Sequence, residues 1–156
     1  MPRIATLTLA LLAVLAPHTA VAAKERRPPP KLQVKTDQQP SAAVPGSPAS
    51  LAVSLIPPDG VVLNRYPGIK IVFEASPGLR PDVPELFAGS RQPIEDPEQF
   101  YYDTKKPLRL DFVAVDGAAT RRTLRGTLSY FYCVKASGFC APGRQKIELP
   151  VKVAVD

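Results

Sequence analysis

Between residues 108 and 114 the sequence reads Leu108-Arg-Leu-Asp-Phe-Val-Ala114, in which apolar side chains at 108, 110 and 112 alternate with other residues. Successive side chains of a strand point to opposite faces of a sheet, so this alternation predicts a strand with one buried face. Further strand candidates lie on both sides of it, at residues 51–56, 61–63, 69–73, 123–132 and 147–155. The sequence shows no amphipathic pattern that would predict a helix of three turns, so it predicts an all-β protein.

Turn signals separate these segments and indicate their architecture. Pro57-Pro58-Asp59-Gly60 predicts a turn, Asp116-Gly117 predicts a hairpin, and Pro150 predicts an edge position or a bulge in the last strand. A proline-rich passage, residues 77–97, separates the early strands from the later ones. About seven short strands in roughly 105 residues are typical of an immunoglobulin-like antiparallel β-sandwich. We therefore expect a single domain of this class over residues 50–156.

The first 49 residues differ from this pattern. Residues 1–22 predict an export signal, with Arg3 before an apolar run and Ala20-Val21-Ala22 as a cleavage site. That run is too short to span a bilayer, so we expect a periplasmic or secreted protein with no transmembrane segment in the mature chain. Residues 24–50 contain six prolines and few large apolar side chains. This composition predicts that residues 23–49 form a disordered linker.

The positive charge of the chain is concentrated near its beginning. The formal net charge is +6, but residues 32–156 contain 15 basic and 13 acidic groups, a balance of +2. Proteins that bind nucleic acid cluster positive charge on the folded domain. The sequence therefore predicts no nucleic-acid partner.

Few catalytic chemistries are open to this chain. Its single histidine, His18, lies in the predicted signal, so the mature protein would lack imidazole. This excludes a Ser-His-Asp triad, a Cys-His pair and a histidine-based metal site. The two cysteines, Cys133 and Cys140, are too few ligands for zinc. We expect neither a metal nor a cofactor, and dithiol/disulfide exchange is the covalent chemistry that remains.

The spacing of the cysteines leaves two interpretations open. Cys133 ends a predicted strand and Cys140 follows a turn at residues 136–138, so the two can face each other across a hairpin and pair in an oxidising compartment. Closing so short a loop contributes about 2.5 kcal/mol on the chain-entropy model. A bond joining two sheets would stabilise more, which favours a functional role. Most disulfides in exported sandwiches are structural, however, and the spacing is not Cys-x-x-Cys.

Three stretches resemble the amino-terminal periplasmic domain of the thiol:disulfide interchange protein DsbD family. An aromatic-rich strand ends at Cys133, and Gly138-Phe139-Cys140 is followed by Pro142. Residues 59–65, leading into residues 69–71, are similar to two early strands of that domain, and residues 95–102 are similar to its cap loop. The chain departs from the family at Val61 and Val62, which replace an aromatic pair. It also ends at Asp156, where the family continues into a membrane domain and a thioredoxin-like domain.

The resemblance implies a function and site residues. Cys140 would be the attacking thiol and Cys133 the resolving one, Phe100 and Tyr101 would shield the pair, and acidic side chains of the loop, Asp96 and Glu98, would raise the thiol pKa. The partners would be thioredoxin-like or membrane thiol-carrier proteins. Two alternatives remain: a secreted binding or assembly module with a structural disulfide, and a redox-inactive relative that still binds a thioredoxin-like partner.

Overall fold

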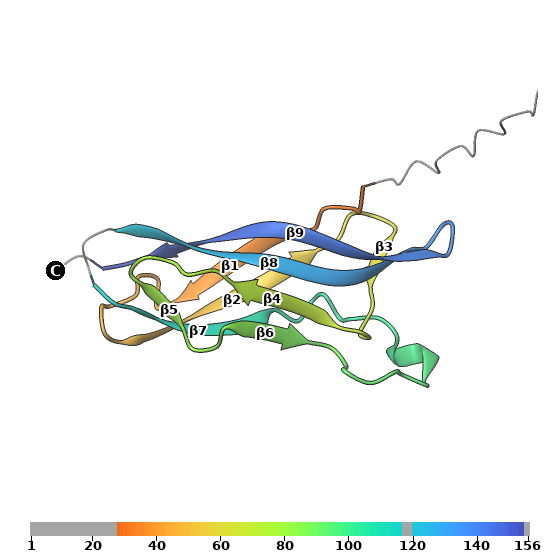
Figure 1. The fold of residues 1–156 in the computed structure, drawn as a ribbon, viewed down its shortest axis with the longest axis horizontal. Helices are drawn as coiled ribbons and strands as arrows, with labels where there is room; N and C mark the ends of the chain where they lie inside the picture. Colours follow the sequence, from red (N-terminus) through yellow and green to blue (C-terminus); the bar gives the residue numbers. More distant parts are fainter. Residues whose placement is uncertain (1–27, 117–119, 155–156) are drawn as a thin grey trace, which may run out of the picture.

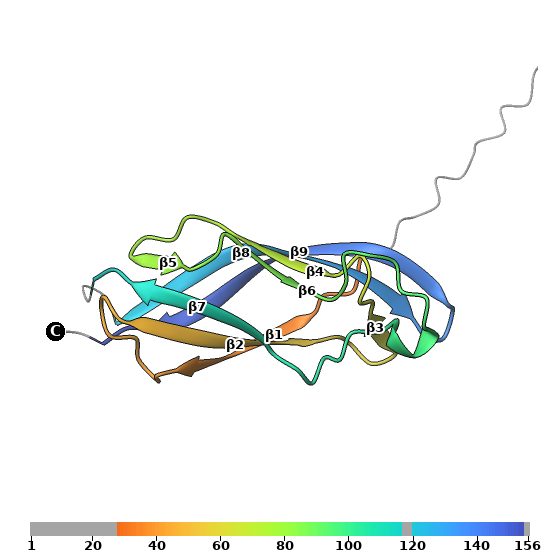
Figure 2. The same ribbon diagram turned by 90° about the horizontal axis from the view of Figure 1, so that it is seen from below.

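The computed structural model describes residues 28–116 and 120–154, which form two antiparallel sheets packed face to face (Figures 1 and 2). The first sheet has the order β1-β2-β7-β5, with β1 (Gln33–Gln39), β2 (Pro48–Ile56), β7 (Leu108–Ala114) and β5 (Leu79–Pro81). The second sheet contains β3 (Val61–Leu63), β4 (Ile69–Phe73), β6 (Glu85–Ala88), β8 (Arg121–Val134) and β9 (Phe139–Lys152). A 3-10 turn, η1 (Pro97–Gln99), precedes β7.

Strand β8 organises the second sheet. It pairs with β9 along its whole length, while β4 and β3 pair with successive parts of it. The orders β1-β2-β7-β5 and β9-β8-β4 correspond to the A-B-E-D and G-F-C sheets of an immunoglobulin domain. The predicted fold class, an immunoglobulin-like β-sandwich, is confirmed.

The core lies between the sheets and follows the alternation in the sequence. In β2 every second residue is buried, and β7 buries Phe112 completely in the same way. Each such side chain contributes about 1.5–3 kcal/mol of hydrophobic stabilisation. The largest fully buried side chains come from both sheets: Leu51, Val53, Leu55, Leu63, Ile69, Ile71, Leu110, Phe112, Leu124, Leu128, Leu149 and Val151.

The prediction that residues 23–49 form a disordered linker is wrong for the part that the structure describes. Residues 33–39 are strand β1, which pairs with β2 along its length, and Leu32 and Ala43 are 4% and 0% exposed. The six prolines of residues 24–50 dominate the average composition of this stretch, and that average does not indicate the short strand within it. An edge strand also pairs through its backbone and needs few large apolar side chains. The domain therefore begins well before residue 50, while the predicted export signal, residues 1–22, lies outside the described residues.

Side-chain amides join the edge of the first sheet to the edge of the second. The Gln38 amide donates to the carbonyl of Lys152 (2.8 Å) and accepts from its N–H (2.9 Å). The Gln145 amide makes the same pair of hydrogen bonds with Leu32, at 2.9 and 2.8 Å. Each glutamine thus substitutes for a peptide group where β1 and β9 lie in different sheets.

Two other expectations need correction. The hairpin predicted at Asp116-Gly117 is wrong, because β7 pairs with β2 and β5 whereas β8 pairs within the other sheet. A local turn signal does not encode which sheet the next strand joins, and Gly117 itself lies outside the described residues. The last strand begins at Phe139, earlier than predicted. Pro150 lies on the outer strand of the sheet, as predicted.

One end of the sandwich gathers three segments that are distant in sequence. Strand β3, the β8–β9 turn and η1 lie at one end of the sandwich, opposite the end where β9 finishes, in both views (Figures 1 and 2). Over the described residues, no helix has the length and apolar character needed to cross a membrane.

Candidate functional site

The two cysteines form a disulfide between directly opposed residues of β8 and β9, with Cα atoms 4.1 Å apart. The backbone N–H of Lys152 faces Gln38 on β1 and not β8, so even-numbered residues of β9 direct their peptide groups away from β8. Cys140 shares this orientation because the register is unbroken between them. The pair is therefore a non-hydrogen-bonded one, the type that brings opposed residues closest.

The disulfide lies on the outer face of the second sheet. In β8 the even-numbered Leu128, Tyr130 and Tyr132 point into the core, so Cys133 points outward. Cys133 is nevertheless only 7% exposed, because β3 lies on one side of it and β9 on the other. Cys140 lies on the outer strand and is exposed. The two cysteines therefore differ in their exposure to solvent.

A four-residue turn, residues 135–138, connects the strands beside the disulfide. The Gly138 N–H donates to the Val134 carbonyl (2.9 Å), and Gly138 has a φ of 65°, which favours glycine. Phe139 follows and is 57% exposed, with its ring edge-on to Tyr132 at 6.5 Å between centroids. The exposed Phe139 ring is thus next to Cys140 in sequence but lies on the opposite face of the sheet from the disulfide.

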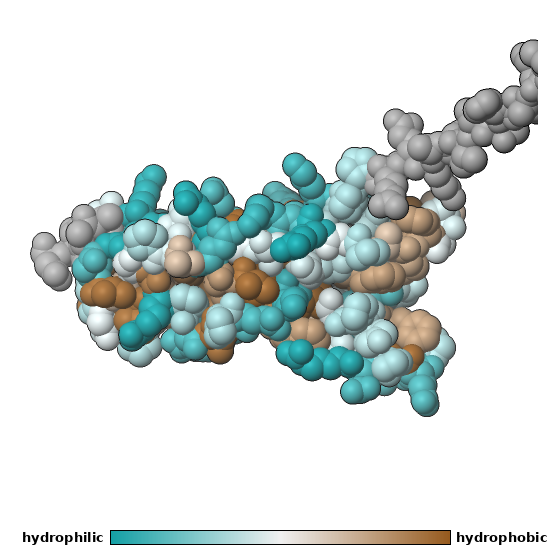
Figure 3. Space-filling view, viewed as in Figure 1, coloured by the Kyte–Doolittle hydropathy of each residue, from teal (hydrophilic) through white to brown (hydrophobic). Residues whose placement is uncertain are grey.

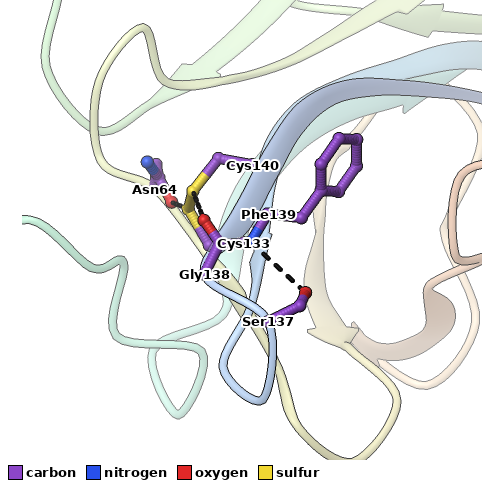
Figure 4. The surroundings of a disulfide bond; sticks show 6 residues. All are labelled: Asn64, Cys133, Ser137, Gly138, Phe139 and Cys140. Atoms are coloured by element: carbon purple, nitrogen blue, oxygen red, sulfur yellow. Dashed lines mark hydrogen bonds between the residues drawn. A yellow bond between two sulfur atoms is a disulfide. The ribbon is translucent and has the colours of Figure 1, made fainter.

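Asn64 contacts the buried sulfur, and sequence reasoning missed this role (Figure 4). Its side-chain oxygen lies 3.2 Å from the Sγ of Cys133, and its N–H donates to the carbonyl of Phe131 at 2.9 Å, which holds it beside β8. Neither sulfur of a disulfide bears a hydrogen. Once the bond opens, a Cys133 thiol can donate to the amide oxygen, or a rotated amide can donate to a thiolate. The sequence feature that could have indicated this role is the position of Asn64 within residues 59–65, the stretch that is similar to an early strand of the DsbD domain.

The two predicted shielding residues lie around Asn64. An isolated bridge pairs Tyr101 with Asn64, and the N–H of Arg65 donates to the Phe100 carbonyl at 2.8 Å. Phe100 and Asn64 both line a hollow of about 230 Å³. The two aromatic residues are 39% and 51% exposed. The structure therefore brings them to the site through Asn64, which lies between Tyr101 and the sulfur of Cys133.

The two predicted acidic residues belong to the η1 turn. The Asp96 carboxylate caps the turn, accepting from the Glu98 N–H at 3.0 Å and from the Gln99 side-chain amide at 2.9 Å. Glu98 is exposed. Within the described part of the chain, neither carboxylate forms a hydrogen bond or ion pair with the cysteine hairpin. The local bonds of Asp96 stabilise the loop that holds Phe100.

Comparison with known proteins finds similarity at the level of structure and not of sequence. No protein-family model matches the sequence, and a search of curated proteins finds no match. Among solved structures, the chain is similar to the cohesin module from a family 33 glycoside hydrolase of Clostridium perfringens. The two are 6% identical with a TM-score of 0.49, over 82% of this chain and 100% of that one. Similarity at this level does not indicate a shared function.

Proposed function

We propose that this protein is an exported thiol:disulfide exchange domain that passes electrons to protein partners through Cys133 and Cys140. The observation that supports this best is the position of the disulfide. It joins two strands that already pair over 14 residues, and it lies on the outer face, where it does not link the sheets. An exposed sulfur on an edge strand beside a buried one is suited to exchange. The resemblance to the DsbD amino-terminal domain points the same way.

The exchange proceeds in two balanced steps. In the reduced protein the Cys140 thiolate attacks a partner disulfide, which breaks that S–S bond, forms a mixed disulfide and releases one partner thiolate. The Cys133 thiolate then attacks the Cys140 sulfur, which re-forms the internal disulfide and releases the second partner thiolate. Two electrons pass to the partner. A dithiol of a thioredoxin-like or membrane carrier protein restores the reduced pair by the reverse steps.

The residues around the sulfurs support these steps. Asn64 positions the Cys133 sulfur and donates a hydrogen bond to its thiolate after the amide rotates. Phe100 and Tyr101 flank Asn64 and limit the approach of small oxidants from that side. Cys140 remains open from the edge of the sheet, where a partner can approach.

The second candidate is a secreted binding or assembly module in which the disulfide is a structural link. The bond lies at the turn end of a long hairpin, where it would keep the strand ends closed. Its contribution to stability would be about 2.5 kcal/mol. In this case the pair would have a reduction potential below about −300 mV, where structural disulfides lie.

A trapping experiment distinguishes these functions. The Cys133→Ala variant lacks the resolving thiol, so Cys140 should hold a thioredoxin-fold partner from a periplasmic extract as a stable mixed disulfide. Cys140→Ala is the matched control and should trap far less, because its remaining thiol is buried. If neither variant traps a partner and glutathione does not reduce the wild-type bond, the exchange function is wrong and the structural link stands.

A further inference from the structure

A shallow groove of about 730 Å³ lies on the outer face of the second sheet. The strand register places it next to the disulfide. Cys133 opposes Cys140, the next outward-facing pair is Phe131 and Pro142, and both of these line the groove. Outward-facing residues of one strand are about 7 Å apart. The groove therefore begins one step along the strands from the reactive sulfurs.

Three cations line this groove. Arg144 opposes Ser129 on β8, which in turn opposes Lys70 on β4. Arg91 contributes the third cation and lies over the ring of Phe87, 4.1 Å from its centroid. These basic groups thus extend across the sheet from β9 to the segment after β6.

Acidic groups offset little of this charge. The residues that line the groove, all within the described part of the chain, include no Asp or Glu. Glu85, outside the lining, lies 3.5 Å from Lys70 and 3.8 Å from Arg91. The three cations and this one carboxylate together give a local net charge of +2. The groove is therefore complementary to an anionic ligand.

The remaining walls are apolar or neutral. Phe131, Pro67 and Pro142 contribute apolar surface. Figure 3 views this outer face and shows hydrophobic groups among hydrophilic ones, with a hollow at the end formed by the β8–β9 hairpin and η1. Such a mixed surface is suited to a peptide with both acidic and apolar side chains.

We propose that the groove binds an extended acidic segment of the partner protein whose sulfurs react at Cys140. This inference rests on the proposed function, because only disulfide exchange at Cys140 requires that the ligand be a protein with its own sulfurs. The chain's own residues 24–27, Lys-Glu-Arg-Arg, have the same sign of charge as the groove and do not complement it.

Binding is tested with a cysteine-free, fluorescent peptide of eight residues in which glutamate and valine alternate, at low salt. It should bind the wild-type protein, and a lysine–valine peptide should not. Arg144→Glu should weaken binding at least tenfold, because it reverses an exposed charge in the groove. Lys35→Glu, on β1 in the other sheet, is the matched control and should change binding less than twofold. Equal losses in the two variants, or no binding to the wild type, would overturn the proposal.

Competing occupants give different results in the same assay. Competition by an eight-nucleotide oligothymidine as strong as that by the glutamate peptide would indicate a general polyanion site and overturn the proposal. Tighter peptide binding after removal of residues 1–27 would identify the chain's own beginning as the occupant. A dimer that the peptide dissociates in sedimentation would identify a second copy. Each of these two results would also overturn it.

Exchange kinetics separate this proposal from the proposed function. Arg144→Glu should slow the reaction of the reduced protein with a disulfide-bearing acidic peptide, yet leave its reaction with neutral hydroxyethyl disulfide unchanged. If the protein reacts with neither disulfide but binds the cysteine-free peptide, the groove proposal holds for binding and the exchange function fails. If it reacts equally fast with both and Arg144→Glu has no effect, exchange stands and the groove proposal is wrong.

Discussion

At the scale of single residues, the two cysteines differ because of the strands that surround them. Cys133 lies between two neighbouring strands, whereas Cys140 lies on the outer strand of the sheet. Asn64 adds to this difference because it contacts one sulfur of the pair and is 69 residues away from it in sequence. The pairing of Cys133 with Cys140 could be predicted from sequence, because they are the only two cysteines in the chain. Asn64 could not, because its position depends on the pairing of β3 with β8.

The role of Asn64 predicts a change in thiol acidity. In a Cys140→Ala background, where Cys133 is the single thiol, Asn64→Ala should raise the pKa of that thiol by about one unit, since a hydrogen bond to a charged group contributes about 1.5 kcal/mol. Asn64→Asp should raise it further through like-charge repulsion. The pH dependence of alkylation measures both. An unchanged pKa in the two variants would show that Asn64 has only a packing role.

At the scale of secondary-structure elements, regular alternation predicted some strands closely and irregular segments poorly. Strands β3, β4 and β7 have the bounds that the sequence indicated. Strand β1 was missed because it contributes one partly buried apolar side chain, Val34, to the core and pairs mainly through its backbone. Short strands β5 and β6 were missed because Pro81 and nearby prolines indicated a loop. Tertiary pairing thus decided the structure where local pattern was weak.

The glutamine contacts between β1 and β9 predict a measurable loss of stability. Gln145→Ala removes two hydrogen bonds to Leu32 in a half-buried site, so we expect the free energy of unfolding to fall by about 1–2 kcal/mol. Gln33→Ala, an exposed position on β1, is the matched control and should change it by less than about 0.5 kcal/mol. Urea titration with the disulfide intact gives both values. Equal effects would mean that the glutamine amide does not hold the two edges together.

At the scale of the whole molecule, the sandwich class was predictable and the start of the domain was not. The number of alternating segments and the turns between them were sufficient for the class. The start of the domain depends on contacts that join the beginning of the chain to its last strand, such as the bridge between Ala43 and Val153. Sequence composition contains no information about such distant pairs. The site likewise depends on the end of the sandwich where β3, the hairpin and η1 come together (Figure 1).

Two truncations test where the domain begins. A chain that starts at Pro28 keeps every contact described above, so its free energy of unfolding should match that of the full chain to within about 0.5 kcal/mol. A chain that starts at Ser41 loses β1, the buried Leu32 and the partners of Gln145. Burial of a leucine contributes about 1.5–3 kcal/mol, and each of the two lost pairs of hydrogen bonds, at Gln145 and Gln38, contributes about 1–2 kcal/mol, so the loss should be at least about 3.5 kcal/mol.

That loss would remove much of the stability of a typical domain, which is about 5–15 kcal/mol. It would also expose the edge of β2, whose unpaired backbone groups can pair with another chain, so the shorter protein should aggregate on size-exclusion chromatography. Leu32→Ala in the chain that starts at Pro28 serves as a milder control and should lose about 2–3 kcal/mol without aggregation. If the chain that starts at Ser41 unfolds at the same urea concentration as the longer one, then residues 28–40 do not stabilise the sandwich and the domain starts later than its contacts indicate.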